Sequence, residues 1–299
     1  MIVKLKPALK SYLWGGTKLK AKWNKQTDNA TLSESWELSF HPDGLATVVG
    51  GEYDGKPLAE VAARDDWGRN SAEFPFFPVL SKIIDSAQAL SIQVHPSDEY
   101  ALEHEGQFGK TEMWYILEAD EGAFLYLGLN RTVSAEEFAA AVDNNTVCSL
   151  LNRVPVKKGE TYFIPSGTIH AIGAGITLYE VQQNSSLTYR VYDFDRTDAN
   201  GNKRPLHVDK AKAVANLNAY EVPDPRRDTL LAKCRYFSAY RFADEREVGR
   251  DDSFVAVTVT DGSIELNGIA LCKGETAFMS AGERARITGK GEYILICVE

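Results

Sequence analysis

Short apolar runs, each stopped by Gly, Pro, Asn or Asp, recur along most of this 299-residue chain. β-branched and aromatic residues are frequent within the runs, and apolar and polar positions alternate in several of them, which is typical of β-strands. The runs are "ATVVG", "ALSIQVHP", "EMWYILEAD", "AFLYLG", "ETYFIPSG", "ITLYEVQQ", "SFVAVTVTDG" and "EYILICVE". Their spacing favours a sandwich or barrel over alternating strand–helix units, so the fold class that we predict is mainly β.

Two segments depart from the strand pattern and have helical spacing instead. Residues 134–144 begin at Ser134, which can cap a helix, and Glu137 follows three residues later. Residues 207–217 form the second such segment. We expect both short helices to connect or flank the β-rich units.

The C-terminal part of the chain repeats an earlier pattern. "KKGETYFIPSGTIHAI" at 157–172 resembles "CKGETAFMSAGERARI" at 272–287 at a constant offset of 115 residues. Upstream of these segments, residues 112–128 can be aligned with residues 253–268 by one gap, and both indicate a strand, an acidic turn and a second strand. The chain therefore contains two related β-units.

The repeated pattern resembles the motif pair of the cupins, so we predict tandem cupin-like jelly-roll β-barrels with a few short helices. The N-terminal metal-binding domain is placed at 1–220 and carries a short helical insert at about 131–153. The C-terminal domain is placed at 221–299, after a linker near 221–228 in which Pro, Asp and Arg cluster. In the alignment His170 corresponds to Ala285 and Glu112 corresponds to Ser253. We therefore expect the C-terminal domain to be degenerate and to lack metal ligands.

Candidate metal ligands gather in the N-terminal unit. Ser91, Gln93 and His95 share one face of a strand, which is the interior face in a cupin barrel, and an unpaired buried amide or imidazole costs about 1–3 kcal/mol. Glu112 opens the next strand, and His170 follows a turn that contains glycine. Gln93, His95, Glu112 and His170 together offer two oxygen and two nitrogen donors, a set that suits one zinc ion (Zn2+) or another divalent first-row metal. A single histidine on a strand is more often a hydrogen-bonded core residue, so the prediction depends on the combination.

Charge and composition narrow the classes of function. The net charge of −9 argues against a nucleic-acid partner, yet it leaves room for an anionic small molecule held by a few local cations. The four cysteines lack metal or redox spacing, and no apolar run is long enough for a membrane span. We therefore expect a cytoplasmic protein with neither a nucleic-acid nor a membrane partner.

Several longer motifs resemble one enzyme family. "SYLWGGTKL", "SIQVHPSDEYA", "GKTEMWYIL" and "IPSGTIHAIGAGITLYEVQQNSSLTYRVYDFDR" are similar to type I mannose-6-phosphate isomerase (phosphomannose isomerase) in its short bacterial form. The resemblance runs from about residue 7 to residue 210 and more weakly to the end. It implies a zinc enzyme that interconverts mannose 6-phosphate and fructose 6-phosphate, with the family's zinc ligands at the four positions that strand phase already selected.

The resemblance also assigns roles in the active site. It places the family's active-site lysine at Lys110, its arginine at Arg190 and an active-site acid at Glu180, and it associates Lys82 and Ser91 with the substrate phosphate. Isomerisation through an enediol needs a group that moves a proton, for which Lys110, Glu180 and a hydroxide at the metal are alternatives. The long helical domain of larger members is reduced here to the insert at 131–153, which affects the expected cover of the pocket. Trp14 and Trp36 also match family motifs, and we expect them to be packing residues.

Two other functions fit part of the pattern. His95, Glu112 and His170 alone form the two-histidine, one-carboxylate set of an Fe2+ oxygenase, which the fourth ligand Gln93 and the phosphate-suited cations disfavour. A non-catalytic sugar-phosphate sensor is disfavoured because the sequence shows no helix-turn-helix or basic tail.

Overall fold

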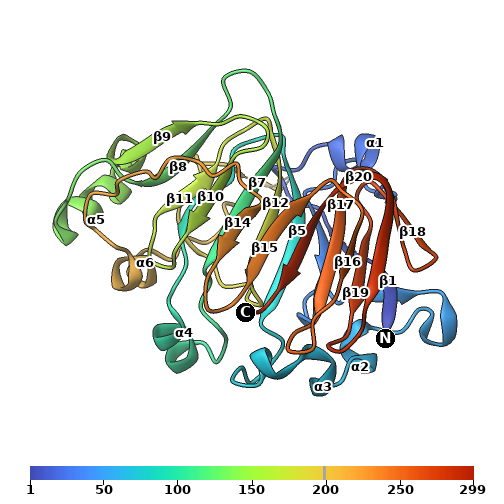
Figure 1. Cartoon of the computed structure of the whole chain (residues 1–299). Helices are drawn as coiled ribbons and strands as arrows, with labels where there is room; N and C mark the ends of the chain where they lie inside the picture. Colours follow the sequence, from blue (N-terminus) through green and yellow to red (C-terminus); the bar gives the residue numbers. More distant parts are fainter. Residues whose placement is uncertain (198–199) are drawn as a thin grey trace.

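The computed structural model describes residues 1–197 and 200–299, and their strands form three antiparallel sheets (Figure 1). The five-stranded sheet has the order β13 (Tyr189–Tyr192), β6 (Ile92–Val94), β11 (His170–Ile172), β8 (Phe124–Leu129) and β9 (Leu151–Pro155). The six-stranded sheet has the order β10 (Thr161–Ile164), β7 (Glu112–Ala119), β12 (Ile176–Gln183), β5 (Val79–Ser86), β3 (Glu34–Leu38) and β2 (Ala8–Lys10). The mainly β fold class is confirmed.

The nine-stranded sheet contains most of the C-terminal residues. Its main path is β14 (Leu230–Lys233), β15 (Ser238–Phe242), β20 (Ala285–Cys297), β17 (Val255–Leu266), β19 (Thr276–Met279), β1 (Ile2–Lys6) and β4 (Thr47–Val49). β16 (Arg246–Val248) pairs with β20, and β18 (Ile269–Cys272) pairs with β17. The N-terminal strand β1 thus completes a sheet built mainly from C-terminal strands. The domain boundary between 220 and 221 stays a prediction.

The helices are short and lie around the sheets (Figure 1). The α-helices are α1 (Lys18–Lys22), α2 (Leu58–Val61), α3 (Arg64–Trp67), α4 (Asp98–His104), α5 (Ala135–Asp143) and α6 (Val208–Val214), and the 3-10 turns are η1 (Gly51–Tyr53), η2 (Arg69–Ser71) and η3 (Val147–Leu150). α5 begins as predicted, because the Ser134 hydroxyl accepts the backbone N–H of Glu137 at 3.1 Å. α6 ends earlier than the predicted residue 217, because Ala215 has extended backbone angles.

The internal repeat is present in the structure. β10 and β19 begin and end at residues related by the predicted offset, and Gly159 and Gly274, which precede them, share a positive φ. Both copies also close the turn in the same way, since the Glu160 carboxylate accepts the N–H of Lys157 and the Glu275 carboxylate accepts that of Cys272, each at 2.8 Å.

One detail of the alignment was wrong. Glu112 lies opposite Ile164, whereas Met279, the counterpart of Ile164, lies opposite Val255. Glu112 therefore corresponds to Val255 and not to Ser253. The error arose because the turn predicted around Asp261 is an irregularity inside the continuous strand β17, where register shifts between Val259 and Asp261.

The central strands of the six-stranded sheet are buried on both faces, and buried polar residues such as Lys82 and Glu180 stand among the apolar ones. Along β7, Met113, Tyr115 and Leu117 pack in the core against the nine-stranded sheet. Trp114 and Ile116 point the other way, into the core shared with the five-stranded sheet. The insert at 131–153 contains α5 and η3, which pack with α6 over the five-stranded sheet. Because side chains alternate along each strand, one face of the sheet packs against the nine-stranded sheet. The other face, which carries Glu112, points toward the five-stranded sheet.

Candidate metal centre and active-site pocket

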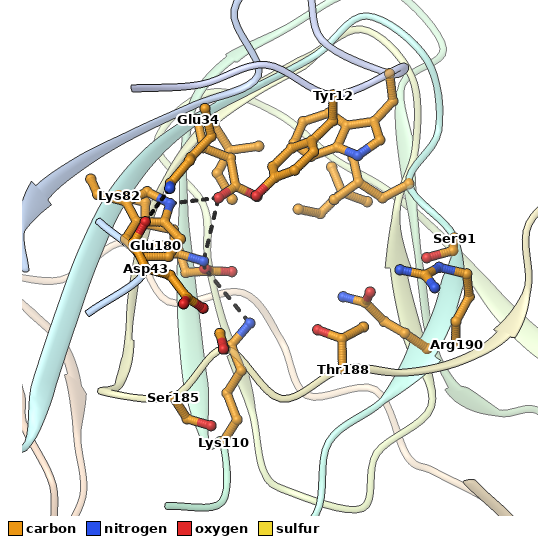
Figure 2. Close-up of a pocket in the computed structure, with 18 of the residues that line it drawn as sticks. Tyr12, Glu34, Asp43, Lys82, Ser91, Lys110, Glu180, Ser185, Thr188 and Arg190 are labelled. Atoms are coloured by element: carbon orange, nitrogen blue, oxygen red, sulfur yellow. Dashed lines mark hydrogen bonds and ion pairs between the residues drawn. The ribbon is translucent and has the colours of Figure 1, made fainter. Parts of the chain in front are cut away.

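A polar cavity of about 300 Å³ opens between the five- and six-stranded sheets (Figure 2). Its wall includes eight residues with ionisable acidic or basic side chains, namely Lys10, Glu34, Asp43, Lys82, Lys110, Glu180, Arg190 and Arg204. Trp14, Trp36, Ser91 and Gln93 also line it. A cavity of this size with convergent charged groups suits a small polar ligand.

Three of the four predicted metal ligands come together beside this cavity. His95 follows β6, Glu112 opens β7 and His170 opens β11, and their ligand atoms all lie within 4.8 Å of one another. His170 Nε2 is 3.3 Å from Glu112 Oε1, and His95 Nε2 is 3.6 Å from Glu112 Oε2. The fourth, Gln93, pairs directly with His170 across β6 and β11, and its amide nitrogen lies 3.3 Å from His170 Nε2.

The surroundings of the two histidines prepare them as ligands. The Nδ1 atoms of His95 and His170 lie 2.8 Å from the carbonyl oxygens of Leu187 and Thr168, which places the ring proton on Nδ1 and leaves Nε2 as an acceptor. Burial lowers the pKa of His170 to about 4 and that of His95 well below its ordinary value, so both rings are neutral near pH 7.

The residues present fit a divalent cation. Among the described residues, His95 Nε2 and Glu112 Oε1 are buried without a hydrogen-bond partner, which is costly unless another group satisfies them. Burial also raises the pKa of Glu112, and a bound cation would offset the cost of keeping it ionised. Gln93, His95, Glu112 and His170 are the residues that would hold the metal.

A buried chain of alternating charges extends from Glu112 along the pocket wall. The Lys110 ammonium lies 2.8 Å from Glu112 and 3.8 Å from Glu180, and the Lys82 ammonium lies 3.3 Å from Glu180 and 3.6 Å from Glu34. Strand register produces this order, because Glu180 of β12 lies directly opposite Lys82 of β5. Figure 2 shows Glu34, Lys82, Glu180 and Lys110 in a continuous row.

Electrostatics hold Glu180 and Lys82 of this row in their charged forms. Burial by itself would raise the pKa of Glu180, but the ammonium groups of Lys110 and Lys82 outweigh it and hold that pKa below its ordinary 4.5. The indole N–H of Trp114 also donates to Glu180 at 2.8 Å. Burial opposes the charge of Lys82, but Glu34 and Glu180 raise its pKa overall. Glu180 is therefore an anion near neutral pH.

The opposite wall of the pocket carries arginine. Figure 2 shows Ser91, Thr188 and Arg190 together, across the cavity from Lys82. One guanidinium nitrogen of Arg190 donates to the carbonyl of Pro205 at 2.8 Å, while its buried Nε has no partner among the described residues. Arg204 lines the same pocket and is oriented by two hydrogen bonds to Asp193, of 2.7 and 2.6 Å.

The structure thus separates the predicted site residues into two groups. Lys110 contacts the proposed ligand Glu112, and Glu180 and then Lys82 follow it along the charged row. Ser91 and Arg190 lie on the other wall (Figure 2).

The sequence reasoning did not select Tyr12, Glu34, Asp43 or Arg204, which also line the pocket. Glu34 could have been found, because it lies two residues before Trp36, and residues two apart on a strand share a face. Arg204 comes from a segment without periodic pattern, and no local signal marks it.

A glycine pair brings aromatic residues to the pocket. A Cβ atom at Gly15 would lie 2.2 Å from Ser33 Oγ and one at Gly16 2.4 Å from Asp85 Oδ2, so only glycine lets this loop approach the sheet. The loop places Tyr12 and Trp14 at the cavity. Trp14 and Trp36 are buried, as expected of packing residues, and both also line the pocket.

Comparison with known proteins agrees with this arrangement. Residues 2–122 match the family model for the catalytic domain of type I phosphomannose isomerase. The chain is 37% identical over 276 residues to a mannose-6-phosphate isomerase of Streptococcus mutans, covering 88% of this chain and 87% of that protein. It is 38% identical over 273 residues to the mannose-6-phosphate isomerase ManA of Bacillus subtilis, covering 86% and 84% of the two chains.

Solved structures show the same similarity over nearly the whole length. The crystal structure of the mannose 6-phosphate isomerase from Bacillus subtilis matches with a TM-score of 0.88 at 34% identity and covers 99% of both chains. No helix among the described residues is long and apolar enough to cross a membrane. The similarities agree with the pocket and with the buried ligand cluster. The chain therefore belongs to the type I phosphomannose isomerase family, whose members are aldose-ketose isomerases.

Proposed function

We propose that this protein interconverts mannose 6-phosphate and fructose 6-phosphate by proton transfer through an enediol, with a divalent metal bound at Gln93, His95, Glu112 and His170. The observation that carries the proposal is the buried His95, Glu112 and His170 cluster beside a cavity with cations on two opposed walls. The names of the related proteins, all mannose-6-phosphate isomerases, support the same substrate.

The metal would supply a Lewis acid that polarises the substrate oxygens at C1 and C2, and Zn2+ suits the donor set. The chain's own groups then have to move protons between carbon and oxygen atoms. Lys110 is the best placed of these, because it lines the cavity and its ammonium lies 2.8 Å from the ligand Glu112. We assign Lys110 to the proton transfer: its neutral amine takes the proton from one of the two carbons, and the ammonium so formed returns it to the adjacent carbon.

Glu180 has two possible roles beside Lys110. As an anion within 3.8 Å of Lys110, it orients the Lys110 ammonium. As a carboxylate on the cavity wall beside Lys110, it is also the alternative base that would take the substrate C–H proton. A carboxylate with a lowered pKa is a weak base, which favours the orienting role. Lys82, held by Glu34 and Glu180, extends this arrangement.

The phosphate of the substrate is assigned to the opposite wall. Arg190 has an unpartnered Nε and neighbours Ser91, and a dianion rewards such charge-assisted hydrogen bonds. Lys82 was predicted to bind the substrate phosphate, but its ammonium pairs with two carboxylates. These contacts favour a role near Glu180 over a role at the phosphate.

The proposal is tested by measuring fructose 6-phosphate formation from mannose 6-phosphate before chelation, after exhaustive chelation and after addition of Zn2+. Activity that disappears and returns supports a metal-dependent isomerase. A folded, zinc-loaded protein without activity would contradict it. Dioxygen uptake by an Fe2+-loaded sample would then favour the oxygenase, since His95, Glu112 and His170 alone match that ligand set.

A further inference from the structure

A second buried polar cluster lies on the face of the six-stranded sheet that points away from the pocket. Its members come from three strands of this sheet, from two strands of the nine-stranded sheet and from the loop after α1. They are Ser81, Tyr179, Ser35, Glu37, Thr258, Thr276 and Lys25, and the most exposed of them, Lys25, has an exposed fraction of 5%. We call these seven residues the back-face network.

Hydrogen bonds connect the network from one sheet to the other. The Tyr179 hydroxyl lies 3.0 Å from Ser81 Oγ and 2.8 Å from Thr258 Oγ1, and Thr258 Oγ1 lies 2.9 Å from Thr276 Oγ1. Thr276 Oγ1 donates to Glu37 Oε2 at 3.2 Å. Thr258 of β17 and Thr276 of β19 lie directly opposite each other in the nine-stranded sheet, so they form one contact point.

The far end of the network is a buried ion pair. Glu37 Oε1 accepts the Ser35 hydroxyl at 2.6 Å and lies 2.6 Å from the Lys25 ammonium. Glu37 stands where the register between β3 and β5 shifts, between Trp36 and Leu38. Such irregularities redirect side chains next to functional sites, and here Glu37 points to the back while Trp36 faces the pocket.

Each of the three network strands in the six-stranded sheet also carries a pocket residue at the adjacent position. Ser81 precedes Lys82 on β5, and Tyr179 precedes Glu180 on β12. On β3, Ser35 and Glu37 alternate with Glu34 and Trp36. Because neighbouring strand residues point to opposite faces, the network holds the backbone directly behind the charged row of the pocket.

We propose that the back-face network is a positioning device, through which Thr258 and Thr276 of the C-terminal β-unit align the strands that carry Glu34, Lys82 and Glu180. This inference rests on the proposed isomerase function and goes beyond it, because it gives the unit without metal ligands a part in the reaction. Buried hydroxyl pairs add little net stability compared with apolar groups of the same shape. Catalytic groups, however, must be held to about 0.5 Å, and a displacement of about 1 Å can cost on the order of 100-fold in rate.

The test uses substitutions in the C-terminal unit, away from the pocket. Thr258→Val removes the hydroxyl that joins the nine-stranded sheet to Tyr179 and keeps the shape, whereas Thr258→Ser keeps the hydroxyl. Thr260→Val is the matched control, because Thr260 is buried on the same strand and its hydroxyl has no partner among the described residues. We would measure kcat and KM for mannose 6-phosphate, the metal content and the thermal unfolding midpoint of each variant.

We expect Thr258→Val to lower kcat by about tenfold with KM within about twofold, since alignment of reacting groups is lost while substrate contacts remain. Thr258→Ser should restore most of kcat, and Thr260→Val should leave it unchanged. Equal kcat in Thr258→Val and Thr258→Ser would overturn the inference. An inactive, zinc-loaded wild-type protein would overturn the proposed function instead. If Thr258→Val does not fold, Tyr179→Phe removes the same link from the other sheet, and unchanged kcat there would equally overturn the inference.

Discussion

The two β-units of this chain share a scaffold and differ in what fills it. In the N-terminal unit, Glu112 begins β7 of the six-stranded sheet and His170 begins β11 of the five-stranded sheet, and both lie beside a polar cavity. In the C-terminal unit the corresponding positions are Val255 and Ala285, which belong to a continuous apolar cluster. The same strand pairing therefore supports either a metal centre or a packed interior. The choice depends on a few inward-facing residues and not on the fold.

The largest difference in activity is expected between substitutions of Glu112, a proposed metal ligand, and of Val255, its counterpart in the C-terminal unit. Glu112→Gln should abolish metal binding at neutral pH and lower kcat by roughly 1,000-fold or more, because the site loses its only negative ligand and its Lewis acid. Val255→Ala should keep metal and activity and lower the free energy of unfolding by about 2 kcal/mol, since it leaves a cavity. Metal analysis, kinetics and urea unfolding check both. Normal zinc content in Glu112→Gln would contradict the assignment.

A smaller difference in activity is expected between substitutions of Lys110 and Ser253, which lie two residues before Glu112 and Val255. Lys110→Met should lower kcat by about 100-fold while the metal stays bound, because the lost amine takes part in the proton transfer and is not a ligand. Ser253, two residues before Val255, accepts the N–H of Val298 at 2.9 Å. Ser253→Ala should therefore cost about 1–2 kcal/mol of stability and leave kcat unchanged. A loss of metal in Lys110→Met would show that the lysine acts on the site's structure and not on the proton.

The sequence predicted the buried cluster of candidate metal ligands better than the rest of the pocket. The period of two along a strand places Gln93 and His95 on one face, and the pairing of Gln93 with His170 follows once β6 and β11 are neighbours. Arg204 and Tyr12 could not be found in this way, because irregular loops bring them to the cavity and no period governs a loop. The irregularity in β17 was mistaken for a turn for a related reason. Asp and Gly occur both in turns and at irregularities within a strand, and only the strand pairing distinguishes a turn from such an irregularity.

The stability of the N-terminal unit should depend on pH through Glu180. The pKa of Glu180 is lower in the folded protein than its ordinary 4.5, so the stability it contributes is complete above about pH 4.5 and is lost as pH falls through the folded pKa. Urea unfolding of the metal-free protein and of Glu180→Gln at pH values from about 6 down to 3 should show a stability difference that shrinks over the acidic part of this range. A difference independent of pH would mean that Glu180 is not held as an anion by its lysine neighbours.

The smallest effect compares a side-chain contact that both units share. Glu160 and Glu275 close equivalent turns, but Glu160 also accepts the Tyr162 hydroxyl at 2.9 Å and a guanidinium N–H of Arg227 at 2.6 Å, whereas Glu275, which is more exposed than Glu160, pairs with Lys4 at 2.7 Å. Glu160→Gln should cost about 1–2 kcal/mol of stability and Glu275→Gln less than about 1 kcal/mol, because exposed ion pairs contribute little. Urea unfolding measures both, and neither change should alter kcat. Equal losses would mean that the shared turn contact dominates, and that the additional partners of Glu160 add nothing to the stability of the unit that holds the metal ligands.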